Sequence, residues 1–253
     1  MWPVADGDEI PVARLHRFLD LPDTLRALGL DHPRPVLVVA GSAGALSEPD
    51  FAQLAPIFEE GIVPLVVAHG AAVVDGGTDA GVMRLMGLAR AGMAGAFPLV
   101  GVAPAGKVPA PGHPAPHGAT ALAPHHSHII LVPAASWADG SPWLATVATA
   151  LAGGQPTATV LFGGGDVTWI DAAASVAGGR PLVAVRGTGG VADALAVALE
   201  GAEDDPRAGA IVATGLLRVV DGRGGPAAVA TAVSQALARS PAASAARPES
   251  AGR

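Results

Sequence analysis

Four times along this chain, a short apolar run ends in a glycine-rich turn and is followed by helix-forming sequence. The turns lie at 41–44, 76–78, 163–166 and 187–190. A continuous apolar run such as 35–40 is typical of a parallel strand that is covered on both faces. Because strands that alternate with helices build crossover units, the pattern restricts the chain to a doubly wound sheet. We predict an α/β fold that is Rossmann-like, with a mostly parallel sheet and helices on both faces.

The chain divides into four stretches by composition and periodicity. The stretches are an N-terminal extension at 1–34, a Rossmann-like ligand-binding domain at 35–201, a peripheral part of the same domain at 202–239, and a disordered tail at 240–253. The extension carries a short helix within 15–30 that Pro22 is expected to split. The peripheral part is expected to add a strand at 210–212 and a helix. Inside the main domain, we expect a helix at 143–151 that is capped by Ser141 and has Pro142 at its first position.

Charge and cysteine content exclude several classes of function. The net charge of −7 comes with no basic patch, so a nucleic-acid polymer and an anionic membrane are poor partners. The chain has no cysteine, which excludes disulfides and thiolate zinc sites and fits a reducing cytoplasm. No apolar run has the length expected of a bilayer span, and the N-terminus has no positive signal region. We expect a soluble, cytoplasmic protein.

The glycine-rich turns predict a ligand site. Ligands of doubly wound sheets bind beyond the carboxyl ends of the strands, where all these turns fall. Glycine lets backbone N–H groups approach a ligand, and the first turn of a helix favours negative charge. Thr78 and Thr168 are expected to cap helices, while Asp79 is expected to point away from a phosphate or contact ribose hydroxyls. The predicted contacts are Gly41, Ser42, Gly44, Gly76, Gly77, Thr78, Gly81, Val82, Met83, Gly163, Gly164, Gly165, Thr168, Gly187, Thr188 and Gly189.

Three kinds of polar side chain outside the turns extend this prediction. Lys107, the only lysine, begins a loop at 107–126 that is rich in Pro, Gly and His, and it is a candidate phosphate contact. His126 and His128 are expected to help form the ligand site at the mouth of a strand. Arg186 precedes the last turn. No carboxylates or cysteines flank the histidines at 125–128, so no metal site is predicted.

Neither a dinucleotide fingerprint nor a Walker motif is present. The segments 75–83, 126–132, 163–168 and 187–193 nevertheless occur in an order that resembles the SLOG domain of melastatin-type transient receptor potential channels, in its stand-alone prokaryotic form. This resemblance covers about 35–200. It implies a Rossmann-like domain that senses a nucleotide-derived ligand, with ADP-ribose and related NAD products as leading candidates and no required cofactor. The channels commonly have arginine where this chain has Gly190, and Arg186 is the nearby residue that can supply a similar charge.

A second function class remains open. The segment 164–171 is similar to the signature of the LONELY GUY phosphoribohydrolases, with the shorter Asp171 in place of their glutamate. That resemblance implies cleavage of an N-glycosidic bond with Asp171 as the catalytic carboxylate, although the arginine-lysine motif of those enzymes has no counterpart. The binding module is the favoured hypothesis and the nucleotide hydrolase is the alternative. A binding module without an effector domain needs a homo-oligomer or an effector protein as its partner.

Overall fold

The computed structural model describes residues 2–3, 9–44, 46–93, 97–109, 115–202 and 205–239. Within these residues, eight strands form one sheet in the order β10-β9-β8-β4-β5-β6-β7-β3, and all neighbouring strands are parallel. The strands are β3 (Val12–Arg14), β4 (Val36–Gly41), β5 (Ala72–Asp75), β6 (Leu99–Pro104), β7 (His128–Val132), β8 (Thr157–Phe162), β9 (Leu182–Arg186) and β10 (Leu217–Asp221). A separate antiparallel pair joins β1 (Trp2–Pro3) to β2 (Glu9–Ile10). The tail at 240–253 lies outside the described residues.

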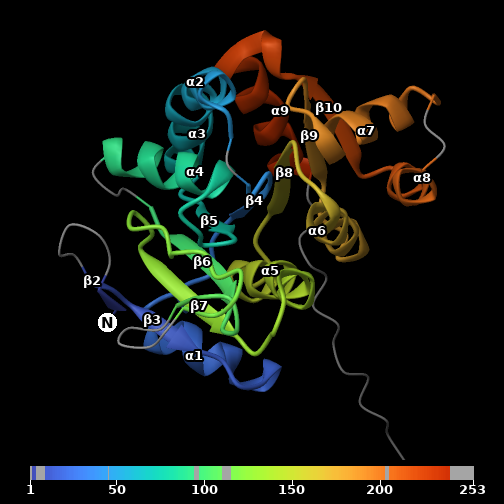
Figure 1. The fold of residues 1–253 in the computed structure, drawn as a ribbon. Coiled ribbons are helices and arrows are strands. Elements are labelled where there is room, and N and C mark those ends of the chain that lie inside the picture. The colour runs from blue at the N-terminus through green and yellow to red at the C-terminus, as the bar shows by residue number, and fades with distance from the viewer. Residues whose placement is uncertain are drawn as a thin grey trace, which may run out of the picture.

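Helices cover both faces of this sheet (Figure 1). They are α1 (Leu21–Ala27), α2 (Glu48–Pro56), α3 (Val63–Ala68), α4 (Gly81–Gly92), α5 (Trp137–Ala152), α6 (Asp166–Ala177), α7 (Gly190–Leu199), α8 (Pro206–Ala213) and α9 (Gly225–Arg239). Alternate side chains of β4 point to opposite faces. Leu37 and Val39 join a core with α2, α3, α4 and α9, whereas Val36 and Val38 join a core with α1 and α5. Helices α6, α7 and α8 enclose a third core against β8, β9 and β10. The predicted fold class is confirmed.

The strand order reverses beside β4. After β4, the chain adds β5, β6 and β7 on one side and then crosses back to add β8, β9 and β10 on the other. The carboxyl ends of β4 and β8 therefore flank a topological switch point, where connections leave the sheet in opposite directions. This crevice is the place in the fold where a ligand is most readily held.

One helical stretch corrects the expectation that no apolar segment has the length of a bilayer span. Helices α2 and α3 are joined by a π-helical turn, η3 (Ile57–Ile62), so the chain is helical from Glu48 to Ala68. Among the described residues, this 21-residue helix is the one whose length and composition are sufficient to cross a membrane, with mean hydropathy 1.5 over its most apolar 18 residues. Phe58, Ile62 and Val66 are fully buried against the sheet. The stretch is a core helix of this fold.

The expected start of α5 is wrong. The helix begins at Trp137, because the hydroxyl of Ser136 accepts a hydrogen bond from the backbone N–H of Asp139 and caps it. Ser141 therefore lies inside the helix and is buried, and Pro142 lies in the second turn. This shift turns a presumed cap into a side chain that faces the interior.

Two further local predictions are wrong. Pro22 does not split a helix, because it occupies the first turn of α1, where a missing N–H leaves no bond unmade. The segment 210–212 lies in α8, which Asp205 caps by accepting from the N–H of Arg207. The strand that pairs with β9 is β10, which follows the positive-φ residue Gly215.

Candidate functional site

A cavity of about 370 Å³ lies at the switch point, between the carboxyl ends of β4 and β6 and the helices α5 and α6. We call it the switch-point cavity. Its apolar wall includes Met83, Trp137 and Leu144, and its polar wall includes Ser141 and Asp171. The predicted site residues that line it are Gly41, Gly44, Gly76, Thr78, Met83, Gly165, Thr168 and Asp171. An apolar pocket with a few convergent polar groups is the usual form of a small-molecule site.

A second, more open hollow of about 620 Å³ lies between α2 and the turn after β9. We call it the α2 groove. Its predicted residues are Ser42, Gly44, Gly165, Gly187, Thr188 and Gly189, and the sequence did not single out its other polar residues, Asp50, Gln53 and Asp193. The groove and the switch-point cavity share Ala43, Gly44 and Gly165. They therefore adjoin at the turn after β4.

The N-terminus of α6 lies at this junction. Gly165 precedes the 12-residue helix, and Asp166 and Val167 begin it. The first N–H groups of an α-helix have no partner within the helix, and the helix dipole favours an anion beside them. The junction is thus suited to an anionic group of a ligand.

The glycine-rich turns pack tightly against one another. The N–H of Gly164 donates to the Ser42 hydroxyl over 3.0 Å, and the N–H of Gly163 donates to the Thr188 hydroxyl over 2.7 Å. The N–H of Val82 donates to the carbonyl of Ser42 over 3.0 Å. Several donors that were expected to face a ligand therefore hold the turns together, and the close approach itself requires glycine.

Gly190 shows how strict this requirement is. Its φ is +51°, and a Cβ added there would lie 2.1 Å from the carbonyl oxygen of Gly164. The arginine of the channel proteins does not fit this backbone. Arg186, the expected replacement charge, pairs with Glu200 over 2.7 Å and lines neither hollow. This chain therefore has glycine where the channels have arginine because the turn at Gly190 packs against the turn at Gly164.

The two threonines do not act as the predicted helix caps. Helix α4 begins at Gly81 after Ala80, and Thr78 instead forms an isolated β-bridge with Leu122. Thr78 is only 3% exposed, and its hydroxyl has no hydrogen-bond partner although it lies in the wall of the cavity. Thr168 occupies the third position of α6, with its hydroxyl 3.5 Å from the carbonyl of Gly41.

Asp171 lies in the wall between α5 and α6. Burial raises the pKa of this carboxyl from 3.8 to about 6, and a hydrogen bond donated by the Ser141 hydroxyl opposes the rise. Both side chains line the switch-point cavity. Ser141 was missed as a site residue because its helix was expected to start later. The Ser136 and Asp139 spacing, a helix-capping pattern, was the signal that could have corrected this.

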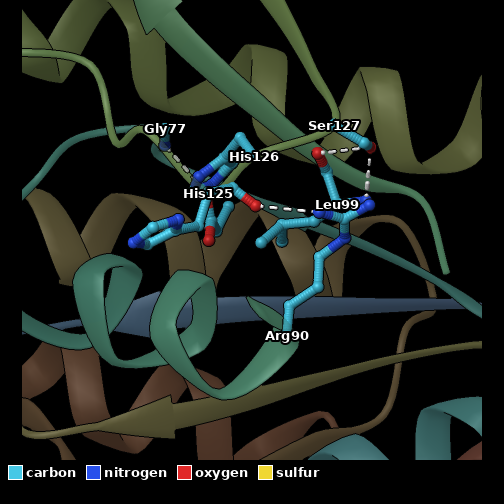
Figure 2. A network of polar contacts seen from close by, with 7 residues as sticks. Gly77, Arg90, Leu99, His125, His126 and Ser127 are labelled. Carbon is cyan, nitrogen blue, oxygen red and sulfur yellow. Dashed lines mark hydrogen bonds and ion pairs between the residues drawn. The ribbon is translucent and has the colours of Figure 1, made fainter. Parts of the chain in front are cut away.

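His126 belongs to a buried network beneath α4 rather than to either hollow. Its Nε2 lies 2.7 Å from Oδ1 of Asp75, and both side chains are 0% exposed. The same oxygen accepts the N–H of Gly77 over 2.8 Å. Figure 2 shows the surrounding contacts, in which Arg90 of α4 donates to the backbone carbonyl of His125. The network fixes the turn after β5 and the loop that ends at His126.

The remaining predicted residues lie away from the hollows. Nζ of Lys107 donates to the carbonyl of His117, inside its own loop. His128 begins β7, so it lies at the amino end of that strand, and burial lowers its pKa. Asp79 is exposed, and its Oδ1 lies 3.7 Å from Nε of Arg84. No group of three or more potential ligands is placed to hold a metal ion in the part of the chain that the structure describes.

Comparisons with known proteins agree with the fold. A family model described as SLOG in TRPM, prokaryote, matches residues 34–231. The structural-genomics target TM1055 is similar at 20% identity, with a TM-score of 0.53, over 79% of this chain and 99% of that one. The molybdenum cofactor carrier protein of Chlamydomonas reinhardtii is similar at 18% identity, with a TM-score of 0.51, over 81% of this chain and 99% of that one. No curated protein matches. The resemblance found in the sequence is confirmed, and the chain belongs to the prokaryotic family of SLOG domains related to those of TRPM channels.

Proposed function

We propose that this domain binds a nucleotide-derived ligand in the switch-point cavity, with an anionic group against the first turn of α6. ADP-ribose and related NAD products are the candidates that the family resemblance suggests. The observation that carries the proposal is the Thr78 hydroxyl, which is buried in the cavity wall without a partner. A buried polar group without a partner is costly, and a ligand that hydrogen-bonds to it removes this cost.

The position of the cavity supports the proposal. It lies at the carboxyl edge, where the strand order reverses, and α6 presents its first N–H groups there. Apolar side chains including Met83 and Leu144 suit a base, and polar side chains suit a sugar. In this proposal the domain acts in the cytoplasm without a cofactor, and it passes its signal through a homo-oligomer or an effector protein.

A thermal-shift panel tests the proposal. ADP-ribose, cyclic ADP-ribose, NAD, AMP and ATP are each added to the full chain. A ligand at a hundred times its dissociation constant adds about 2.7 kcal/mol to the free energy of unfolding. We expect a clear rise in Tm with at least one compound, and mass spectrometry should recover that compound unchanged. No shift with any of the five would contradict nucleotide binding.

A variant that lacks the Thr78 hydroxyl tests whether this group contacts the ligand. Thr78→Val keeps the shape of the side chain and removes the hydroxyl, so the affinity for the ligand should fall about two- to tenfold. The protein itself should not lose stability, since the hydroxyl makes no hydrogen bond in the protein. Thr231→Val, on the exposed face of α9, is the control and should leave the affinity unchanged. Equal ligand affinities of the wild type and Thr78→Val would show that the Thr78 hydroxyl does not contact the ligand.

Asp171 keeps the hydrolase alternative open. It lines the same cavity, and a carboxyl with a pKa of about 6 is suited to exchange a proton near neutral pH. In this alternative Asp171 protonates the leaving base or stabilises the charge that develops on the ribose. Incubation with each nucleotide, followed by mass spectrometry, distinguishes the two functions. Release of base that is lost in Asp171→Asn while binding persists would establish the hydrolase.

A further inference from the structure

The long helix that begins at Glu48 changes its hydrogen-bond pattern part of the way along. Between α2 and α3 it passes through the π-helical turn η3, in which the N–H of Val63 donates to the carbonyl of Phe58. Pro64 accounts for this turn, because proline has no N–H and its ring clashes with the carbonyl four residues earlier in an α-helix. Helices bend at π-helical turns and at interior prolines. The helix is therefore able to bend at η3.

The helix is packed differently on the two sides of this turn. Leu54 is the one buried residue among the nine of α2, and Phe51 and Ala55 are only partly buried. In contrast, η3 buries four of its six residues and α3 buries three of its six. Helix α9 also holds η3 closely, since a Cβ added at Gly61 would lie 2.8 Å from the carbonyl oxygen of Pro226. The core thus anchors η3 and α3 more firmly than α2.

Helix α2 forms one wall of the α2 groove. Asp50 and Gln53 line the groove from this helix, and the turn after β9 lines it from the other side. That turn is fixed, because the carboxylate of Asp193 accepts the N–H of Gly187 over 2.6 Å and the N–H of Gly189 over 3.2 Å. A change in the angle of the helix at η3 therefore changes the width of the groove.

We propose that α2 is a lid, hinged at η3, that opens and closes the α2 groove. This inference goes beyond the proposed function, since it concerns the free protein and holds for any occupant of the groove. Segments that bury little surface open at a lower cost in free energy than the core does. Helix α2 moves relative to η3 and α3, while the far wall of the groove stays in place. A lid of this kind admits a ligand and then excludes water from it.

Hydrogen exchange of the full chain, followed by NMR, compares the two sides of the hinge. The amides of 52–55 in α2 and of 65–68 in α3 all lie beyond the first turn of the long helix. A nine-residue helix is only marginally stable in water once it leaves the core, so its amides exchange whenever the lid is open. The amides of 52–55 should exchange at least about tenfold faster than those of 65–68. Equal rates in the two stretches would overturn the inference.

A proline variant tests whether the hinge lies at η3. Pro64 is exposed, and Pro64→Ala supplies the missing N–H and permits an unbroken α-helix. The ratio of the two exchange rates should fall about three- to tenfold. Pro49→Ala is the matched control, because Pro49 lies in the first turn of α2, where a missing N–H leaves no bond unmade. A ratio that Pro64→Ala leaves unchanged would mean that α2 opens without a hinge at η3, against the inference.

Spin labels measure the movement across the groove. The chain has no cysteine, so a pair of cysteines introduced for labelling is the only pair present. Labels at Gln53, on α2, and at Leu199, at the exposed end of α7, should give a broad or two-peaked distribution of distances. The control pair, Glu60 in η3 and Leu199, should give one narrow peak because both elements are anchored. Narrow peaks for both pairs would show that α2 does not move, and the lid would be excluded.

Discussion

Two aspartates, one beneath α4 and one between α5 and α6, are buried in different ways. Asp75 is fully enclosed, and a single carboxylate oxygen accepts both from the ring of His126 and from the N–H of Gly77. Asp171 has one hydroxyl partner, Ser141, and opens onto the switch-point cavity. The comparison separates a structural aspartate from a candidate site residue. A carboxylate held by an imidazole and a backbone N–H fixes a turn, whereas one with a single partner in a cavity wall remains available to a ligand.

The largest effect is expected where the pair beneath α4 is broken. His126→Ala leaves Asp75 buried without its imidazole partner, and removing one member of a buried pair costs about 3–5 kcal/mol. The free energy of unfolding, from urea denaturation, measures this loss. His125→Ala is the matched control, because His125 contributes its backbone carbonyl to Arg90 and that contact survives truncation of the side chain. Similar losses in both variants would show that the pair has no special role.

The second prediction concerns the carboxylate in the cavity wall. Folding raises the pKa of Asp171 from 3.8 to about 6, so its contribution to stability is full below about pH 4 and is lost as the pH rises through about 6. Asp171→Asn removes the penalty of a buried charge. The variant should be more stable than the wild type at about pH 7, by roughly 2–3 kcal/mol.

Urea denaturation of both proteins at several pH values checks this effect. The difference in the free energy of unfolding should disappear below about pH 3, where the wild-type carboxyl is protonated in both states. A variant that is less stable than the wild type at neutral pH would mean that the partners of Asp171 outweigh the cost of burying its charge, as is expected for Asp75. The distinction between the two aspartates would then be lost.

The sequence was sufficient for the fold because buried parallel strands are continuous apolar runs that end in turns. It was insufficient for the site because the roles of the turns depend on contacts between distant segments. Gly163 and Gly164 are required where they meet Thr188 and Ser42, and no local pattern reveals that approach. His126 has no local signal that distinguishes an exposed loop histidine from a fully buried one.

The boundaries of helices show a different limit. Pro142 suggested a helix start, but the cap at Ser136 begins the helix earlier and the proline is accommodated in its second turn. This difference decides whether Ser141 caps a helix or faces Asp171. Two competing capping signals within a few residues are resolved by packing, since α5 packs against β4, β6 and α6. The position of one helix boundary thus decides whether Ser141 belongs to the candidate site.

The smallest predicted effect is at Ser141, and it tests whether that hydroxyl acts on Asp171 or only fills space. The hydroxyl donates to the carboxylate and lowers its pKa, so Ser141→Ala should move the pKa further above about 6. The loss of stability should be about 1–2 kcal/mol at neutral pH and smaller at about pH 4, where the carboxyl is neutral. NMR titration of the Asp171 carboxyl measures the shift directly.

In an Asp171→Asn background, the loss of stability caused by Ser141→Ala should be similar at every pH, because the remaining amide does not titrate. If the loss of stability caused by Ser141→Ala depends on pH equally in both backgrounds, another group must be responsible for the pH dependence. Ser141 would then contribute only packing.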